Sequence, residues 1–554
     1  MSSGFNLAPR EHANFAVSSR LLSCLVTESL LRAFYLEAKH SRGMTGILVI
    51  LSTSVMSEQP VITRTLRPND IFAIVPLRNP PVFTDARPTK HGRVVGLVDP
   101  LDMIPEIYIL AETISGAPDG INETILSCLR PPPWELGKFN SLAKCTDPTD
   151  LWNKFVKDVF IPDSLSESIA GELRSSWAWQ LASYENPPAC PSRGSPPIEW
   201  EQSLMHRARM CADAPSNYNW YLPQIRFVRV PSESLDIRGP FDSIMRDFVN
   251  KASLASGTEI PVDVPGTTFM PVHEMQLPTV VAKFKNVQVL EPSIGVLGQS
   301  SIRTMLVPAL PNMALKVSVN MKISSALRTI SHWTADFGPR FSRDIVPKLT
   351  VNHKIFDVEL EPASAIYAGV DSSVRKHFTA IFRHEYIPAP GENIIVVAAL
   401  LEMGHAGVPA GVSAVEHIFG LDTEEKRIAF LDKYLRLACE ALIPPALHNG
   451  VVFEAHAQNC LLRFDIATGE PLGFVRIIRL LGMHCNGRGW EMLRGHLRDI
   501  IPQDHGLWKS WMETDTVPGK CLMRMRLQSV HDKMVFSPVP NMLLYRPEAA
   551  AVEA

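Results

Sequence analysis

In LKVSVNMKI, residues Leu315 to Ile323, apolar and polar side chains alternate strictly. Successive side chains of a β-strand point to opposite faces, so one continuous strand here would bury five apolar residues on one face. Its other face would carry four polar side chains, those of Lys316, Ser318, Asn320 and Lys322. The pattern predicts a buried strand with a cationic face, and a surface strand with solvated lysines is the alternative.

Polar residues on both sides of this segment are suited to anions. Upstream, Ser300-Ser301-Ile302-Arg303-Thr304 groups hydroxyls around one guanidinium, which can hold a phosphate oxygen in fixed geometry. A capped turn is the alternative for that run. Downstream, Ser324 or Ser325 could cap a helical turn with Arg328 near its N-terminus, where backbone N–H groups favour anions. The pattern G-x-x-x-x-G-K-[ST] is absent, so no P-loop is expected.

A third polar group follows Gly450 in the run GVVFEAHAQN. If this run is an extended strand, Glu454, His456 and Gln458 point the same way and Asn459 lies at its end. A carboxylate and two amide oxygens are hard ligands suited to Mg²⁺, and the imidazole could bind a carboxylate or transfer a proton. The alternative is a polar strand end satisfied within the protein.

Length and composition exclude several classes of protein. The chain has 554 residues, enough for about three or four packing units or one large fold. Its 54 basic and 57 acidic residues nearly balance, which argues against nucleic acid or an anionic membrane as partner. Nine scattered cysteines without a C-x-x-C pair disfavour a zinc site or a disulfide framework. With no apolar run of about 20 residues, we expect a soluble cytoplasmic protein.

The periodicity indicates an α+β, or mixed α/β, protein. Proline-rich boundaries at 186–197 and 388–391 divide the chain into three segments. The expected helices run from Glu11 to about Lys39 and onward from a cap at Asp422. The expected strands are Gly46 to Leu51, Ile71 to Leu77, Thr279 to Leu290, Ala314 to Ile323 and Ile394 to Leu401.

Taken in order, these motifs resemble the NRPS-independent siderophore synthetases, the aerobactin synthetase (IucA/IucC-like) family of adenylate-forming ligases. The resemblance covers about residues 270 to 480 and rests on the Ser301-x-Arg303-Thr304 run, Lys316 with Arg328, Arg383-His384-Glu385, and the run from Glu454 to Asn459. The run Phe15 to Leu22 looks like the opening of fungal-type members, which extends the resemblance over most of the chain.

The resemblance implies a fold shaped like a cupped hand. It implies an N-terminal thumb-like domain over residues 1–185, a strand-rich fingers-like domain over 198–387 and a mostly helical palm-like domain over 391–554. It also implies that ATP lies between fingers and palm, and that the protein is a homodimer.

The implied activity is ATP- and Mg²⁺-dependent ligation of a citrate-like or secondary-metabolite carboxylic acid to an amine or alcohol, through an acyl-adenylate. By resemblance, His456, Lys316 and Arg328 are catalytic, with His456 facing the carboxylate or the transferring phosphate. Glu454, Gln458 and Asn459 hold Mg²⁺. The nucleotide is bound by Ser301, Arg303, Thr304, Lys316, Ser325, Arg328 and Arg383.

Two departures from the family pattern keep a second function open. The Gly-His-Pro element that precedes a basic pair in the family is missing before Met205-His206-Arg207. Leu480 stands where the family has an aspartate that helps to bind the metal, and such losses typically reduce metal affinity or activity 10- to 100-fold. The alternative is therefore a family member of secondary metabolism that acts without ATP, as a cyclase, an isomerase or another non-ligase enzyme in the same cleft.

Overall fold

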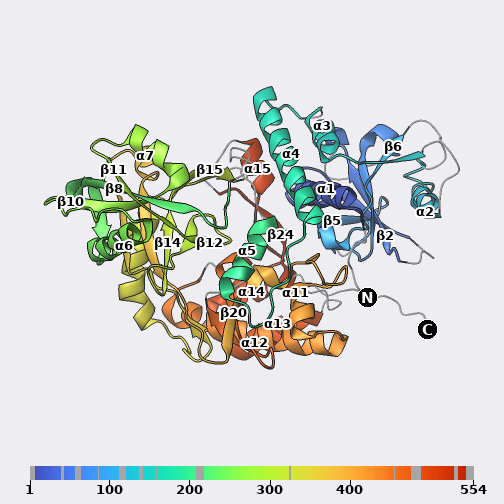
Figure 1. The fold of residues 1–554 in the computed structure, drawn as a ribbon. Helices are drawn as coiled ribbons and strands as arrows, with labels where there is room; N and C mark the ends of the chain where they lie inside the picture. The colour runs from blue at the N-terminus through green and yellow to red at the C-terminus, as the bar shows by residue number, and fades with distance from the viewer. Residues whose placement is uncertain are drawn as a thin grey trace. The chain divides into compact units, whose positions relative to one another are not determined.

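The computed structural model describes residues 7–38, 43–55, 64–84, 87–111, 120–136, 141–157, 159–207, 218–323, 326–453, 456–475, 488–528 and 534–544. These residues form two compact units (Figure 1). The first contains the residues up to Asn186 and those from Lys509 onward, and the second contains Pro187 to Trp508. Both contain helices and sheets, which confirms the predicted α+β class. The finer division into thumb, fingers and palm stays a prediction.

A seven-stranded antiparallel sheet forms the centre of the first unit, in the order β4-β5-β1-β2-β3-β6-β7. The strands predicted at Gly46–Leu51 and Ile71–Leu77 are confirmed as β2 and β3. Every residue of both is buried, because α1, α3 and α4 pack on one face of the sheet and α2 packs on the other. The other strands are β1 (Ala33–Glu37), β4 (Val82–Phe83), β5 (Arg93–Leu97), β6 (Tyr108–Ala111) and β7 (Ser141–Lys144); the helices are α1 (Pro9–Thr27), α2 (Gly120–Cys128), α3 (Pro148–Lys157) and α4 (Asp163–Glu185).

The helix predicted from Glu11 to Lys39 is wrong in its second half. α1 ends at Thr27, and Ser29 then takes a left-handed backbone conformation with φ of 54°. The next residues, Ala33–Glu37, pair with β2 instead. Tyr35 is buried as the apolar pattern predicted, but it is buried on a strand, because sheet pairing overrides a helical period that continues by chance. Lys39 lies outside the described residues.

The first unit is completed by α15 (Leu522–Leu527) and the strand pair β23 (Thr516–Lys520) and β24 (Phe536–Pro540). At the end of α1, the Glu28 carboxylate accepts the backbone N–H groups of Met523 and Arg524, each at 2.8 Å. These are first-turn donors of α15 that the helix itself cannot satisfy. The contact explains why this late segment packs with the N-terminal residues.

Three sheets and a two-stranded ribbon build the described part of the second unit. The sheets have the orders β10-β8-β11, β12-β13-β14-β19-β18-β9 and β17-β22-β21-β20, and β15 pairs with β16. The strands are β8 (Gln224–Pro231), β9 (Leu235–Arg238), β10 (Thr267–His273), β11 (Gln288–Gly295), β12 (Leu297–Gly298), β13 (Thr304–Leu306), β14 (Met313–Val317), β15 (Val319–Ile323), β16 (Ala326–Arg328), β17 (Phe356–Asp357), β18 (Ala363–Tyr367), β19 (Thr379–His384), β20 (Glu392–Val396), β21 (Leu461–Asp465) and β22 (Pro471–Val475).

Two long helices of this unit, α6 and α12, each cover a sheet. The helices of this unit are α5 (Pro197–Arg207), α6 (Phe241–Ser256), α7 (Leu277–Lys283), α8 (His332–Arg340), α9 (Ser372–Arg375), α10 (Val397–Leu400), α11 (Ala414–Phe419), α12 (Glu424–Asn449) and α13 (Arg488–Ile500), and α14 (Gly506–Met512) spans the boundary between the units.

One face of the six-stranded sheet carries the largest core of the second unit. Leu315 and Val317 of β14 and Phe382 of β19 are buried there against α6 and the three-stranded sheet. Phe248 of α6 meets Phe382 edge-on, with ring centroids 6.3 Å apart, and meets Phe227 at 5.0 Å. Because side chains alternate along each strand, the polar residues of these strands must point to the other face.

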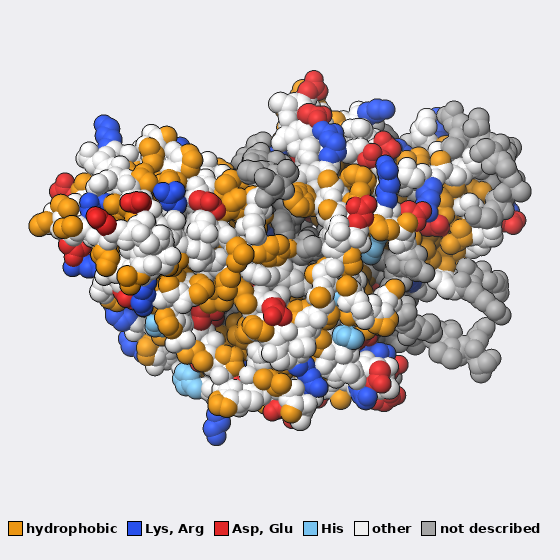
Figure 2. Space-filling model, in the orientation of Figure 1, with side chains coloured by type: hydrophobic (Ala, Val, Ile, Leu, Met, Phe, Trp, Pro, Cys, Tyr) orange, Lys and Arg blue, Asp and Glu red, His pale blue; other side chains and the backbone are white. Residues whose placement is uncertain are grey.

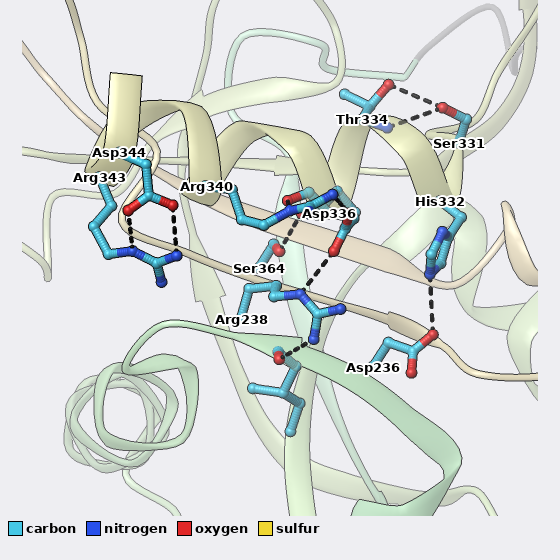
Figure 3. A network of polar contacts seen from close by, with 12 residues as sticks. Asp236, Arg238, Ser331, His332, Thr334, Asp336, Arg340, Arg343, Asp344 and Ser364 are labelled. Carbon is cyan, nitrogen blue, oxygen red and sulfur yellow. Dashed lines mark hydrogen bonds and ion pairs between the residues drawn. The ribbon is translucent and has the colours of Figure 1, made fainter. Parts of the chain in front are cut away.

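That other face is partly covered by α8. Arg238 of β9 donates through Nε to Asp336 at 2.7 Å, and Asp236 of the same strand lies 3.1 Å from Nε2 of His332 (Figure 3). Ser364 of β18 donates to a backbone carbonyl of the helix at 2.6 Å. These contacts hold α8, and with it the chain segment that contains Arg328, on the polar side of the sheet.

The four-stranded sheet is covered by α12, as the apolar pattern beyond Asp422 predicted. Leu431, Leu435 and Ala438 are buried against the sheet. The helix is capped by Thr423, which accepts the N–H of Lys426, rather than by Asp422.

The predicted single strand from Leu315 to Ile323 is wrong, because it is broken into β14 and β15 at Ser318. The Ser318 hydroxyl donates to the Lys376 carbonyl at 2.6 Å and accepts the N–H of Ile330, so the chain turns away from the six-stranded sheet. Asn320 then donates to Thr279 at 3.2 Å instead of joining Lys316. The side chain of Lys322 lies outside the described residues.

Three other predicted elements differ from the structure. The strand expected over Thr279 to Leu290 is α7 followed by β11, and Pro278 at the first turn of α7 favours that helix. The strand expected over Ile394 to Leu401 ends at Val396 and continues as α10. Arg328 lies on β16, four residues ahead of α8, and not at a helix N-terminus.

The surface offers no large area of one charge on the face in view. Acidic and basic side chains are interspersed over the described residues in Figure 2. None of the helices in the described ranges combines the length and apolar character needed to cross a bilayer.

Candidate active site

A cavity of about 540 Å³ opens in the second unit. Its walls come from the polar face of the six-stranded sheet, from β20 and β21, from the start of α5, and from the loop between β12 and β13. A 3₁₀ turn, η8 (Ala457–Asn459), contributes a further wall. The cavity therefore collects residues that lie more than 250 positions apart in the sequence.

Strand register places three predicted residues on one wall. Thr304 of β13 lies directly opposite Lys316 of β14, and Ala314, two residues before Lys316, lies opposite Arg383 of β19. Directly opposed residues, and residues two apart, share a face of a sheet. Thr304, Lys316 and Arg383 therefore all point into the cavity, away from the apolar core.

Two guanidinium groups add to this cationic wall. Arg303 donates through Nη1 to the Thr329 carbonyl at 2.6 Å, next to Arg328 in the chain. Burial and the neighbouring charge of Arg328 lower the pKa of Arg303 to about 10, so the Arg303 guanidinium stays protonated at neutral pH. Because repulsion between buried cations is costly, a bound anion would stabilise this arrangement.

The loop that carries Ser301 is held by backbone hydrogen bonds. The Ser300 N–H donates to Glu201 of α5 at 2.9 Å, and its carbonyl accepts from Nε2 of Gln458 at 3.3 Å. The N–H of Thr304 donates to the Ser301 carbonyl at 2.8 Å, which closes a turn. Ser301 is thus fixed at the cavity wall beside the cations.

The predicted strand after Gly450 is wrong, and the polar residues of that run lie on η8 and just before it. His456 precedes the turn, and Gln458 and Asn459 lie within it; all three line the cavity. Nδ2 of Asn459 lies 2.9 Å from Nε2 of His456, which makes that imidazole nitrogen the acceptor.

The amide groups of this turn fit a hard cation. The NH₂ groups of Gln458 and Asn459 are both used in hydrogen bonds within the protein, so each carboxamide keeps its oxygen for another partner. Within the described residues, no three His, Cys, Asp or Glu side chains form a metal site. A metal here would therefore depend on amide oxygens, on substrate oxygens and on Glu454, which lies outside the described residues.

Three carboxyl groups in the cavity were given no role by the sequence analysis: Glu201, Glu359 and Glu385. Burial, then the charges of Glu359 and Glu201, raise the pKa of Glu385 to about 8. Burial likewise raises the pKa of Glu201. Glu385 follows Arg383 by two residues, so the alternation of the strand could have revealed it. Glu201 and Glu359 gave no comparable signal.

The cavity thus brings together most of the predicted residues. It contains Ser301, Arg303, Thr304, Lys316, Arg328, Arg383, His456, Gln458 and Asn459. Ser325 and Glu454 lie outside the described residues, as does Leu480. The cavity identifies where these side chains meet, and the role of each stays a prediction.

Comparison with known proteins identifies the family of the chain. The model of the IucA/IucC family matches residues 228–402. The NRPS-independent siderophore synthetase rfs of Rhizopus delemar is 32% identical, over 97% of this chain and 97% of its own length. The chain belongs to the IucA/IucC family of siderophore synthetases. Synthetases of this family are ligases, so the protein is an enzyme, and the resemblance stated from the sequence is confirmed.

Solved structures of the family share the fold. The petrobactin biosynthesis protein AsbB of Bacillus anthracis superposes with a TM-score of 0.66 at 13% identity and covers 97% of this chain and 96% of its own. The ATP-bound aerobactin synthetase IucA of Klebsiella pneumoniae gives a TM-score of 0.63 at 14% identity, with 97% and 100% covered. At such low identity the likeness shows the IucA/IucC fold alone.

Proposed function

We propose that the protein is an ATP- and Mg²⁺-dependent ligase that activates a carboxylic acid as its acyl-adenylate and joins it to an amine or an alcohol. The observation that carries this proposal is the convergence of Arg303, Lys316, Arg328 and Thr304 on one wall of a single cavity. The names of two relatives support the class of acid and acceptor. They are the N(2)-citryl-N(6)-acetyl-N(6)-hydroxylysine synthase of Vibrio mimicus and the staphyloferrin A synthase of Staphylococcus aureus.

The cationic wall suits the first half of such a reaction. When a carboxylate attacks the α-phosphorus of ATP, negative charge spreads over the phosphoryl oxygens as pyrophosphate leaves. Lys316, Arg303 and Arg328 would face that charge from fixed positions, and the hydroxyls of Ser301 and Thr304 would donate to the oxygens. Such cations lower the barrier because they need no reorganisation at the moment of reaction.

His456 and the two amides of η8 have a separate role in the proposal. Gln458 and Asn459, with Glu454, would hold Mg²⁺, which supplies charge neutralisation on the phosphate oxygens. His456 lies beside them and would bind the acid or the transferring phosphate. Its Nε2 is held by Asn459, so the proton of a neutral ring lies on Nδ1.

Calorimetric titration with ATP, with and without Mg²⁺, tests the nucleotide part of the proposal. We expect micromolar binding that Mg²⁺ strengthens, and we expect Lys316→Ala to weaken it about 10- to 100-fold, because a hydrogen bond to a charged group contributes about 1.5–3 kcal/mol. Lys348→Ala, which removes an exposed lysine of the same unit, is the matched control and should leave the affinity unchanged. Equal binding by both variants would contradict the placement of the phosphates.

Pyrophosphate release with a panel of acids, citrate among them, tests the chemistry. An acid-dependent signal supports ligation. Leu480 and the missing Gly-His-Pro element favour a second candidate, an ATP-free conversion in the same cavity, such as cyclisation or isomerisation. That candidate predicts no ATP binding and no pyrophosphate with any acid. The homodimer and the cytoplasmic location remain predictions from the resemblance.

A further inference from the structure

Glu201 lines the cavity but takes no part in the proposed reaction, and its contacts give it a different use. Its carboxyl group accepts the backbone N–H of Ser300 at 2.9 Å. The carbonyl of the same serine accepts Nε2 of Gln458 at 3.3 Å. Ser300 is therefore held from two sides, by α5 through its N–H and by η8 through its carbonyl.

Helix α5 gives this contact a fixed support. Trp200 and Leu204 are buried in the core of the four-stranded sheet, and the helix packs on β20. Glu201 lies beside that buried face and reaches the cavity. The next residue, Gln202, donates to the carbonyl of Gly298 at 3.5 Å, at the end of β12. The helix is thus anchored in one core and bonded at two points to the chain that leads into the loop between β12 and β13.

The two hydrogen bonds of Ser300 also fix its neighbours. Ser301 follows directly, and its carbonyl accepts the N–H of Thr304, so the position of Ser300 sets where this turn and its hydroxyls lie. A carboxamide is planar, so the hydrogen bond that Gln458 donates through its nitrogen also sets the direction of its oxygen. A shift of Ser300 would therefore move the proposed phosphate donors and one proposed metal ligand together.

We propose that Glu201 is a positioning residue, which links the phosphate wall to the metal ligands by holding Ser300. This inference rests on the proposed function. A backbone N–H is a strong donor that needs a partner, so without an acceptor at position 201 the Ser300 N–H would turn toward water or another oxygen. Its carbonyl would move with it and release Gln458. The strengthening of ATP binding by Mg²⁺ should then suffer more than ATP binding itself.

Hydrogen exchange of the backbone amides, measured by mass spectrometry on the full chain without any ligand, tests the contact itself. We expect the Ser300 amide to exchange about fivefold or more faster in Glu201→Ala, because the hydrogen bond that protects it is lost. Glu201→Gln keeps a side-chain oxygen as acceptor and should exchange like the wild type. Glu199→Ala removes an exposed carboxylate from the same helix and is the matched control. Equal exchange in Glu201→Ala and the wild type overturns the proposal.

Calorimetric titration with ATP, with and without Mg²⁺, tests the link to the metal ligands. The quantity compared is the ratio of the two affinities, because a variant that is merely less well folded loses affinity equally in both titrations. Glu201→Ala should lower this ratio about fivefold, the effect of one hydrogen bond, while Glu201→Gln and Glu199→Ala should keep it.

The outcomes separate this inference from the proposed function. If the wild-type chain binds ATP more tightly with Mg²⁺ and Glu201→Ala shows the same ratio, the role of Glu201 is overturned while the proposed function stands. If the wild-type chain binds no ATP, the proposed function fails and the role of Glu201 toward the metal ligands fails with it. Hydrogen exchange then still shows whether Glu201 holds Ser300.

Discussion

Replacing Glu385 by glutamine should change the pH dependence of stability in a way that can be calculated. Burial, then the charges of Glu359 and Glu201, raise the pKa of this carboxyl group in the folded chain to about 8 from its usual 4.5. Below about pH 4.5 the carboxyl group is protonated in both the folded and the unfolded chain, so it does not lower the free energy of unfolding. As the pH rises from 4.5 to 8, the unfolded chain loses this proton while the folded chain keeps it, so stability falls.

The size of the effect follows from the difference between the two pKa values. Each pKa unit corresponds to about 1.4 kcal/mol, so the free energy of unfolding falls by about 5 kcal/mol between pH 4.5 and pH 8.5. Glutamine keeps the shape of the protonated acid and cannot ionise. Glu385→Gln should therefore match the wild type near pH 4.5 and exceed its stability by up to about 5 kcal/mol at pH 8.5. For a unit of this size that is about 7 °C in melting temperature.

Thermal and urea unfolding of both chains at pH 5 and pH 8.5, followed by tryptophan fluorescence, measures this difference. The Glu233→Gln chain is the control, because it removes a carboxyl group from an exposed position of the same unit. The reasoning is refuted if Glu385→Gln shows the same difference from wild type at both pH values. A second test replaces Glu359 and keeps Glu201. Removing this neighbouring charge must lower the pKa of Glu385, so the gain in stability from Glu385→Gln should become smaller. A larger gain in that background would also contradict the reasoning.

Two further substitutions test the packing that positions the cavity. Gly239→Ala should destabilise the second unit by more than about 2 kcal/mol in urea unfolding, because Gly239 has φ of +65° and a Cβ would lie 2.0 Å from the Pro362 carbonyl. Gly257→Ala, with φ of +68° and nothing within 4 Å, should cost only about 1 kcal/mol, and equal losses would show that the close contact is unimportant. Phe248→Ala should cost about 3–5 kcal/mol, since its ring is fully buried against Phe382, and a loss below 1 kcal/mol would contradict that packing.

The sequence predicts well where one physical rule decides the outcome. Gly46–Leu51 is apolar at nearly every position, and such a run forms a strand when helices cover both faces of its sheet. The direction of the Lys316 side chain is likewise predictable, because apolar and polar residues alternate along β14 and a strand residue can point only to one face of the sheet or the other. Both predictions need no knowledge of distant residues.

The failures share a different cause, which is competition from contacts that no local pattern records. Ser318 continues the alternation perfectly, yet its hydroxyl bonds two backbone groups from other segments and turns the chain. Tyr35 fits a helical stripe and a strand equally well, and pairing with β2 decides between them. In each case the residue type permits both structures, and tertiary contacts select one.

The carboxyl groups of the cavity show why part of a site can escape sequence analysis. Gln299 and Ser300 hold Glu385, Glu201 and Gln458 in place, and Ser300 does so through its backbone N–H and carbonyl. Every residue except proline carries those two groups, so no residue type in the loop signals the contact. Lys316 could be predicted from the sequence because a lysine within an apolar strand stands out from its neighbours. Glu201 lies on α5 and Glu359 lies before β18, and only the fold brings these carboxyl groups into the same cavity as Lys316.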